Sequence, residues 1–484
     1  MTEVLTALSH QWESSVATTL EGLRDVTVTR RCADVAELLS VTDAGLGDTA
    51  VVSSDLRGLD LAVVNRLRAN RIRVIGVHPA DDEPAERRLR QLTIMVTLPV
   101  DAGTDRWEVS LQEGGAADDL EAALSGDVAS GAAQQAPPDH PEGASDGGAG
   151  WRPAGSGGLT AGGERVGSLE DDDPSGDDAA VVRATGSRRG PERAPVIAVW
   201  GPTGAPGRTT VATTLAAEIA ARGVDVLLVD ADTYGGCVAQ TLGLLDEAPG
   251  VAAACRAADQ GLLDLPALAR IAPVVVPGLR VLTGLPKAER WPEVRAAALE
   301  RVLELSRSLV QVVVVDCGFC LEDDEELSYD TVAPRRNEAT LTSLAASDLV
   351  VAVGGADPVA LQRFVRGLQE LGTVPSGEPV PVVNRVRSGA VGSRPQSRIA
   401  DSLLRFAGLA SVRFVPDDAA AVDAALLAGR SVVEHAPDSP VRHAVADLAT
   451  GLLPWTVAST ERGELRGRAR RRGHGRRSSS AVGA

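Results

Sequence analysis

Short apolar segments rich in valine and leucine alternate with helix-compatible segments in two separate parts of this 484-residue chain. In the first part, the apolar segments span residues 4–9, 26–30, 50–54, 74–78 and 94–98. Alternation of this kind favours a parallel sheet with right-handed crossover helices. Aromatic residues make up only 2% of the chain, so valine, leucine and alanine must fill the cores. The predicted fold class is therefore α/β.

Composition divides the chain into four parts. Residues 1–112 and 195–454 carry the strand–helix alternation, and we predict one domain in each. Residues 113–194 between them are rich in Gly, Ala, Pro and Asp, and cannot bury enough surface to offset the entropy of the chain. We predict a disordered acidic linker there. Residues 455–484 are arginine-rich and interrupted by glycine, which predicts a basic disordered tail.

Charge and hydropathy limit the partners and the location. The net charge is −18, which argues against nonspecific nucleic-acid binding by the whole chain. The arginine-rich tail fits contact with anionic lipid or DNA, and equally a solvated tail; both interpretations stay open. No apolar run approaches the ~20 residues of a membrane span, and the first residues lack a signal-peptide pattern. We therefore expect a cytoplasmic protein with no transmembrane segment.

A glycine-rich loop is the first candidate site. The apolar segment Val196–Val199 runs into GPTGAPGRTT, residues 201–210, and a helical pattern follows. Glycines let backbone N–H groups turn inward, and the helix N-terminus adds a dipole that favours phosphate. The loop departs from G-x-x-x-x-G-K-[ST] at Pro202 and Arg208. On this motif alone, a phosphate loop and an ordinary strand–helix turn are equally good interpretations.

Acidic residues at later strand ends favour the phosphate loop. Asp230 and Asp232 close the strand after the loop, and Asp316 closes a strand of five valines. In an open α/β sheet, ligands bind at the carboxyl ends of the strands. A carboxylate there can hold metal-bound water or orient an attacking water beside a Mg²⁺–triphosphate. We therefore expect the loop and these carboxylates to share one edge of the sheet.

The order of these motifs resembles the MinD/ParA family of deviant Walker A ATPases. VLLVDADTYGGCVAQTLGL resembles the family's switch I region, VVVVDCGFC its Walker B strand, and VPVVNRV its adenine-reading segment. VRFVPDDAAAVDAALLAGRSVVEHAPDSPVRHAVADLA resembles its C-terminal base-binding loop and helices. The resemblance covers roughly residues 195–453. It implies a P-loop NTPase domain, a mostly parallel sheet flanked by helices, that binds ATP and Mg²⁺.

The resemblance also assigns roles to individual residues. Seven consecutive loop residues would wrap the phosphates: Gly204, Ala205, Pro206, Gly207, Arg208, Thr209 and Thr210. Thr209 and Asp316 would bind Mg²⁺, and Asp232 would hold the catalytic, water-activating position. The remaining assignments concern the base, with Asn384 on adenine and Pro416 and Asp417 nearby.

Two lysines of the family pattern are replaced. The deviant signature lysine, which in the family reaches across an ATP-sandwich dimer, falls at Thr203. The ordinary P-loop lysine falls at Arg208, whose planar fork differs from a compact ammonium. The resemblance thus implies ATP binding. It leaves open whether ATP is hydrolysed and whether nucleotide drives formation of a homodimer.

The N-terminal domain resembles a response-regulator receiver, which has a flavodoxin-like fold. Asp55 ends the third strand, where a phosphoacceptor would lie, but the first strand leads into Ser9-His10-Gln11 and the domain has no lysine. We therefore interpret it as a pseudo-receiver that contacts protein partners.

A receiver-like domain before a MinD/ParA-like domain is the architecture of CpaE/TadZ proteins, which localise pilus-secretion machinery at a cell pole. Septum-site-determining relatives share it. The leading hypothesis is a nucleotide-dependent spatial-positioning protein at the pole, the septum or the inner face of the membrane. A chromosome- or plasmid-partitioning ATPase and a pseudo-ATPase scaffold are the alternatives.

Overall fold

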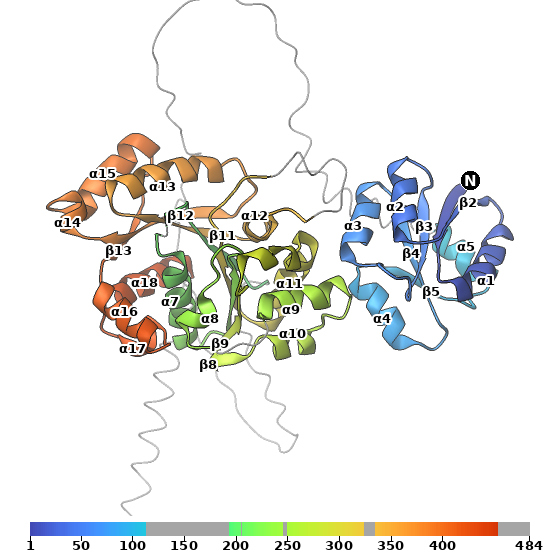
Figure 1. Ribbon diagram of the computed structural model, residues 1–484, viewed down its shortest axis with the longest axis horizontal. Coiled ribbons are helices and arrows are strands. Elements are labelled where there is room, and N and C mark those ends of the chain that lie inside the picture. Colours follow the sequence, from blue (N-terminus) through green and yellow to red (C-terminus); the bar gives the residue numbers. More distant parts are fainter. Residues whose placement is uncertain (113–192, 205, 245–248, 324–333, 454–484) are drawn as a thin grey trace, which may run out of the picture.

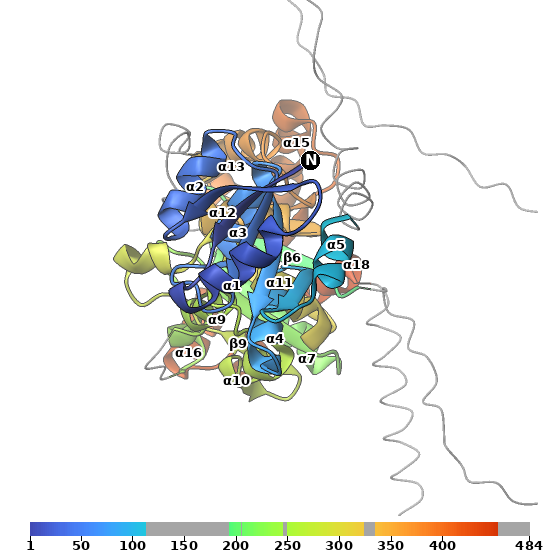
Figure 2. The same cartoon turned by 90° about the vertical axis from the view of Figure 1, so that its right-hand side faces the viewer.

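The computed structural model describes residues 1–112, 193–204, 206–244, 249–323 and 334–453 (Figure 1). Ala205 of the predicted phosphate loop, nearly all of the predicted linker and the predicted arginine-rich tail lie outside these residues. The described residues form two α/β domains, which Figures 1 and 2 show from two directions. The predicted α/β fold class with parallel sheets is confirmed.

The N-terminal domain is built on a five-stranded parallel sheet in the order β2-β1-β3-β4-β5. Its strands are β1 (Thr2–Ala7), β2 (Val26–Cys32), β3 (Thr49–Ser53), β4 (Arg73–His78) and β5 (Val96–Pro99). Its helices are α1 (His10–Glu21), α2 (Val35–Asp43), α3 (Leu61–Ala69), α4 (Glu83–Gln91) and α5 (Thr104–Gln112). This strand order is the flavodoxin-like one. The closer resemblance to a receiver stays a prediction.

Two cores lie on the two faces of this sheet. Leu38, Leu67 and Leu89 from α2, α3 and α4 pack on one face, and Leu20 and Trp107 from α1 and α5 pack on the other. Helices on both faces explain why the inner strands β3 and β4 are almost entirely buried.

One strand boundary differs from the sequence prediction. The apolar run predicts a strand over 94–98, but β5 begins at Val96. Thr93 adopts a left-handed conformation, with φ of 65°, and the chain turns there before it enters the sheet. Ile94 is fully buried in the core although it precedes the strand. An apolar pattern indicates burial, but it cannot distinguish a buried residue in a strand from a buried residue in the turn before it.

The second domain is built on an eight-stranded sheet in the order β13-β12-β11-β6-β10-β7-β9-β8, parallel except for β8. Its strands are β6 (Val196–Trp200), β7 (Val226–Ala231), β8 (Val274–Val276), β9 (Leu279–Leu282), β10 (Val312–Cys317), β11 (Leu349–Gly355), β12 (Glu378–Val386) and β13 (Arg413–Pro416). The five-valine run predicts a strand from Val310, but Val310 instead caps α11 and the strand begins at Val312.

Helices cover both faces of this sheet. The helices of the domain are α7 (Arg208–Ala221), α8 (Val238–Thr241), α9 (Gly250–Asp259), α10 (Leu265–Ile271), η1 (Ala288–Glu293), α11 (Ala296–Leu309), α12 (Glu338–Ala345), α13 (Pro358–Leu371), α14 (Ser388–Val391), α15 (Pro395–Ala407), α16 (Ala419–Leu427), α17 (Val432–His435) and α18 (Pro440–Leu452). On β6, Ile197 and Val199 pack with α7 and α18, whereas Ala198 and Trp200 face the core that includes α9, α11 and α13. The helix α7 therefore starts at the carboxyl end of a central strand, directly after the glycine-rich loop.

The two domains contact each other through α3 and α4 on one side and α9 and α11 on the other. Arg295 forms an ion pair with Asp60 at 3.2 Å. Arg88 donates a hydrogen bond to the carbonyl of Gln260 at 3.0 Å and also bonds the carbonyls of Ser54 and Leu59. Arg88 thus ties the segment after β3 to the end of α9.

Membrane-spanning helices are absent from the described part of the chain, where no helix has the necessary length and apolar character.

Candidate functional site

The glycine-rich loop is held in place by close contacts with neighbouring strands. Gly207 precedes α7 with φ of 94°, a left-handed conformation that favours glycine. A Cβ atom on Gly207 would lie closer than 3.0 Å to Nδ2 of Asn384. That same amide nitrogen donates a hydrogen bond to the carbonyl of Pro206 at 2.8 Å. The end of β12 therefore braces the loop and requires glycine at position 207.

This contact gives Asn384 a structural role that sequence reasoning missed. The side chain is 7% exposed. Its Oδ1 accepts a hydrogen bond from the backbone of Arg385 at 2.9 Å, and its Nδ2 is engaged with Pro206. Contact with adenine stays a prediction, because the described bonds of this amide go to protein atoms.

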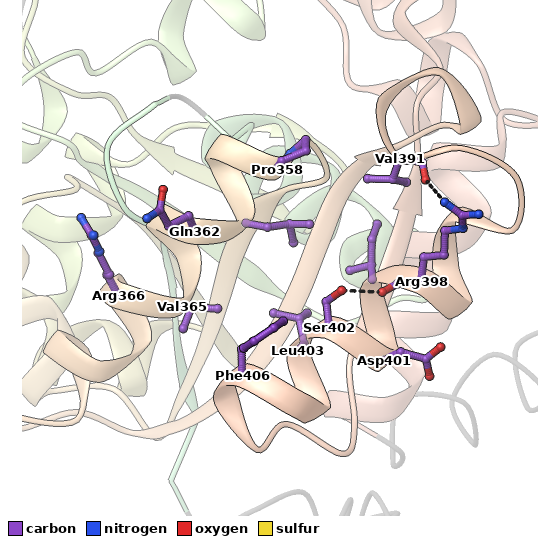
Figure 3. Close-up of a pocket in the computed structure, with 12 residues that line it drawn as sticks. Pro358, Gln362, Val365, Arg366, Val391, Arg398, Asp401, Ser402, Leu403 and Phe406 are labelled. Carbon is purple, nitrogen blue, oxygen red and sulfur yellow. Dashed lines mark hydrogen bonds between the residues drawn. The ribbon is translucent and has the colours of Figure 1, made fainter. Parts of the chain in front are cut away.

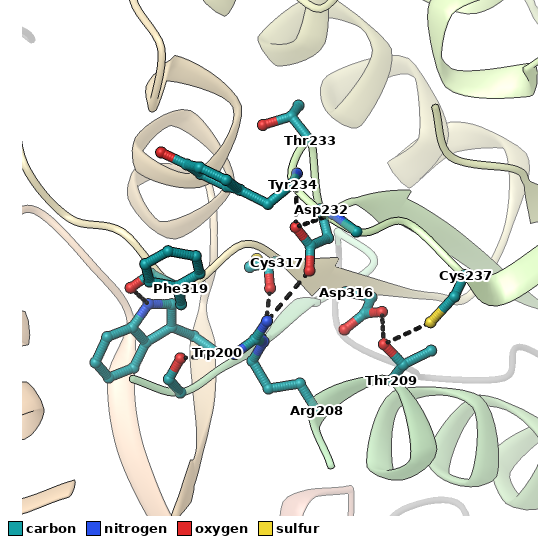
Figure 4. A network of polar contacts seen from close by, with 12 residues as sticks. Trp200, Arg208, Thr209, Asp232, Thr233, Tyr234, Cys237, Asp316, Cys317 and Phe319 are labelled. Carbon is teal, nitrogen blue, oxygen red and sulfur yellow. Dashed lines mark hydrogen bonds and ion pairs between the residues drawn. The ribbon is translucent and has the colours of Figure 1, made fainter. Parts of the chain in front are cut away.

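Thr209 and Asp316 meet at the start of α7, as the sheet topology predicts. The Thr209 hydroxyl donates a hydrogen bond to Oδ2 of Asp316 at 2.6 Å, and the Cys237 thiol lies 3.6 Å from the same hydroxyl (Figure 4). The other carboxylate oxygen, Oδ1 of Asp316, is buried and has no hydrogen-bond partner among the described residues. A buried polar atom without a partner is costly, so this oxygen marks a place for a ligand.

Two further carboxylates lie beside this pair. Asp230 stands opposite Asp316 in the register of β7 and β10. Burial raises the pKa of Asp230 to about 7. Burial also raises the pKa of Asp316 well above its usual range, the charge of Asp230 raises it further, and the bond from Thr209 opposes the shift. Carboxylates held this way gain stability when a cation neutralises them.

Asp230 has a second role that the sequence did not indicate. Its Oδ2 accepts a hydrogen bond from the backbone of Val238 at 3.0 Å, and a Cβ atom on Gly236 would lie 3.0 Å from its Oδ1. The buried carboxylate thus fixes the segment that follows β7. That segment carries Asp232 and Tyr234.

The loop's own cation, Arg208, is turned back into the protein. Its Nη2 lies 3.2 Å from Oδ2 of Asp232, and its Nε donates to the carbonyl of Cys317 at 3.1 Å (Figure 4). Its Nη1 donates to the carbonyl of Gly201 at 3.2 Å. The side chain is only 12% exposed. Arg208 therefore crosslinks the loop to the ends of β7 and β10, and its charge is countered by Asp232.

Asp232 is held by this arginine and by its own turn. Its Oδ1 accepts hydrogen bonds from the backbone N–H groups of Tyr234 and Gly235 at 2.9 and 3.2 Å. With Oδ2 on Arg208, both carboxylate oxygens have protein partners. Oδ2 has one described partner and can accept one further hydrogen bond, so Arg208 restrains the orientation of Asp232 toward a water molecule.

A small aromatic group beside the carboxylates also escaped sequence reasoning. The rings of Tyr234 and Phe319 lie 4.8 Å apart, and the Trp200 indole donates to the carbonyl of Phe319. The guanidinium of Arg336 lies 3.7 Å from the centre of the Tyr234 ring. The sequence offered one indication of this group: aromatic residues make up only 2% of the chain, yet Trp200, Tyr234 and Phe319 all lie next to the predicted motifs.

The remaining predicted residues lie on the same edge of the sheet. Pro416 pairs with Val386, two residues after Asn384 on the neighbouring strand. The Asp417 carboxylate lies 3.6 Å from the guanidinium of Arg387. The structure thus brings Arg208, Thr209, Asp232 and Asp316 into one bonded network. It places Asn384, Pro416 and Asp417 on the other side of the loop.

The oxygen atoms of the network fit a divalent cation. Mg²⁺ prefers hard oxygen ligands and retains several waters. The Thr209 hydroxyl and the unpartnered Oδ1 of Asp316 are such ligands, and they lie where the dipole of α7 would face bound phosphate. The geometry can therefore hold Mg²⁺ together with an anionic phosphate group.

Comparison with solved structures finds similar proteins among ParA, MinD and McdA structures. A ParA family ATPase from Chlorobium tepidum is 20% identical over 53% of this chain and 97% of its own, with a TM-score of 0.45. The septum site-determining protein MinD from Pyrococcus horikoshii, complexed with Mg-ADP, is 17% identical over 54% and 96%, with a TM-score of 0.42. An ATP complex of a McdA variant from Cyanothece is 15% identical over 53% and 96%, with a TM-score of 0.40. No protein-family model and no curated protein matches the sequence.

Proposed function

We propose that this chain binds Mg-ATP at the loop formed by residues 201–210 and acts as a MinD/ParA-like spatial-positioning protein. The observation that carries the proposal is the pair Thr209–Asp316. A hydroxyl at the start of α7 bonds a buried carboxylate whose second oxygen has no partner among the described residues. In phosphate-loop proteins this hydroxyl and this carboxylate hold the metal ion that accompanies the triphosphate.

The site favours a switch with low turnover. Asp232, the residue proposed to orient water, is bonded through both of its oxygens to other parts of the chain. Arg208 holds Asp232, the loop and the end of β10 together. This crosslink restrains Asp232 and would slow its alignment with an attacking water. ATP binding and slow turnover would then set two states that partners can distinguish.

We further propose that the N-terminal domain supplies protein contacts in a CpaE/TadZ-like arrangement. Asp55 is exposed and accepts a hydrogen bond from Gln11 at 2.8 Å, at the place where a working receiver has acidic neighbours. Burial raises the pKa of Asp55, but hydrogen bonds from Ser53, Ser9 and Gln11 outweigh it and lower the pKa overall. The cargo would be pilus, secretion or septum machinery at a pole, at the septum or at the inner face of the membrane.

A pseudo-ATPase scaffold is the second candidate, because one observation favours it. Arg208 already fills its donors with Asp232 and backbone carbonyls. If Arg208 keeps these partners, its charge does not reach a phosphate group. The domain would then bind protein partners without binding nucleotide. The two candidates differ in one property, namely affinity for Mg-ATP.

The test measures Mg²⁺-dependent binding of a fluorescent ATP analogue to the full chain and to Thr209→Ala and Asp316→Ala. Each substitution removes a hydrogen bond to a charged group, so we expect the affinity for the ATP analogue in the presence of Mg²⁺ to fall about 10- to 100-fold. Thr214→Ala is the matched control: Thr214 lies one helical turn after Thr210, and among the described residues its hydroxyl bonds only a backbone carbonyl of α7, that of Thr210. If both site variants bind as tightly as the wild type, the metal site is misplaced.

A further inference from the structure

Helix α13 packs directly on the phosphate loop. A Cβ atom on Gly367 would lie 3.0 Å from Cβ of Pro202 and 3.1 Å from the Trp200 ring. Phe364, on the same side of the helix, is fully buried against Gly354 of β11. The absence of a side chain at Gly367 thus lets the backbone of α13 approach the loop closely. Two contacts fix the position of the helix.

Arg363 lies one helical turn before Gly367 and therefore on the same side of α13. Its Nη1 lies 2.8 Å from the position that a Cβ atom on Gly204 would take. Gly204 itself has φ of 110° and is exposed. The guanidinium therefore stands over a loop residue that has no side chain, next to Thr203, which carries no charge.

The charge of Arg363 is available, unlike that of Arg208. Within the described ranges, the structure shows no hydrogen bond or ion pair for Arg363, and the residue is exposed. Arg208 is 12% exposed and paired with Asp232. A nucleotide triphosphate brings several negative charges to the loop, and a guanidinium fork matches phosphate oxygens with two parallel donors.

We propose that Arg363 binds the terminal phosphates of the nucleotide and supplies positive charge there in place of Arg208, whose charge is paired with Asp232. This inference rests on the proposed function and deepens it, because it assigns phosphate recognition to a residue of α13, far along the chain from the loop's own arginine. It predicts selectivity for triphosphate over monophosphate. Leu361, Val365 and Arg366 of the same helix line a pocket shared with α15 (Figure 3).

Two exposed arginines of α13 supply a matched pair of variants. Arg363→Ala removes the guanidinium over the loop. Arg366→Ala removes an exposed guanidinium three residues along the same helix, at a position that lines the pocket; among the described residues, the contacts of Gly204 involve Arg363 and not Arg366. Both are measured in the full chain by calorimetric titration with Mg-ATP, Mg-ADP and AMP, after melting curves have shown that both variants fold as the wild type does.

We expect Arg363→Ala to weaken Mg-ATP binding about 10- to 100-fold, with a smaller loss for Mg-ADP and none for AMP. Arg366→Ala should bind all three as the wild type does, and Arg363→Lys should lie between Ala and wild type. Equal losses for ATP and AMP would assign Arg363 a role in the shape of the loop and overturn the inference. If Arg363→Ala binds Mg-ATP as tightly as the wild type, the inference is overturned, but the proposed function is not. If the wild type binds no nucleotide, both the inference and the proposed function are overturned.

Discussion

Substitution of Gly207 by alanine tests how the end of β12 braces the loop. Alanine at φ of 94° would be strained by about 1 to 2 kcal/mol. Its Cβ would also displace the Asn384 amide and break the bond to the Pro206 carbonyl. Loss of a buried hydrogen bond costs about 1 to 3 kcal/mol. The expected destabilisation of the second domain is therefore about 2 to 5 kcal/mol.

Gly223→Ala separates the two contributions. Gly223 has φ of 78°, but a Cβ atom there would meet nothing within 4 Å. This control retains the backbone strain and lacks the clash, so we expect a loss of only about 1 to 2 kcal/mol. Calorimetric melting of the full chain would measure both variants, since a loss of 1 kcal/mol lowers the midpoint of a domain this size by about 2 to 4 °C.

A double variant then identifies the contact. Gly207→Ala and Asn384→Ala act on the same hydrogen bond, so their combined cost should fall short of the sum by about 1 to 3 kcal/mol. Two results would contradict a stabilising contact between Asn384 and the loop. One is a loss of stability in Gly207→Ala no larger than that in Gly223→Ala, and the other is full additivity of the losses in Gly207→Ala and Asn384→Ala.

Two other substitutions address the network and the domain contact. Arg208→Lys should raise ATP turnover several-fold in a phosphate-release assay, because an ammonium cannot reach all the acceptors of Arg208 and would free Asp232; an unchanged rate would place the limit elsewhere. Asp259→Asn addresses a carboxyl near Asp60 and Arg295: burial raises the pKa of Asp259 to about 6, Arg295 lowers it and Asp60 raises it. A raised folded-state pKa means that stability present at low pH is lost as pH rises through about 6. Between about pH 4 and 7, the free energy of unfolding of the wild type should therefore decrease by about 1 kcal/mol relative to that of Asp259→Asn, after allowance for solvent screening. Thermal melting of both proteins across this range measures the difference, and an equal dependence on pH in both would contradict the prediction.

The periodic parts of the fold were predictable from local sequence. Valine-rich runs separated by helical patterns fixed the strand–helix alternation, and the structure has parallel sheets with helices on both faces. The meeting of Thr209 and Asp316 followed from one rule about strand ends. Their proposed role in metal binding stays a prediction.

The orientation of long side chains was not predictable. The motif placed Arg208 at the loop, but whether its guanidinium faces phosphate or Asp232 depends on the carbonyls of Cys317 in β10 and of Gly201 in the folded loop. Arg363 had no sequence signal at all, since its position over Gly204 depends on the packing of Gly367 against Pro202. Local periodicity specifies elements, whereas tertiary contacts decide which polar atoms meet.

A calorimetric titration of Mg-ATP into the purified 484-residue chain tests nucleotide binding at the loop most directly. The geometry of Thr209, Asp316 and the loop predicts one site per chain with a micromolar dissociation constant, and much weaker binding when Mg²⁺ is chelated. A folded chain that takes up no Mg-ATP would contradict the account. That result would favour the pseudo-ATPase scaffold, the second candidate.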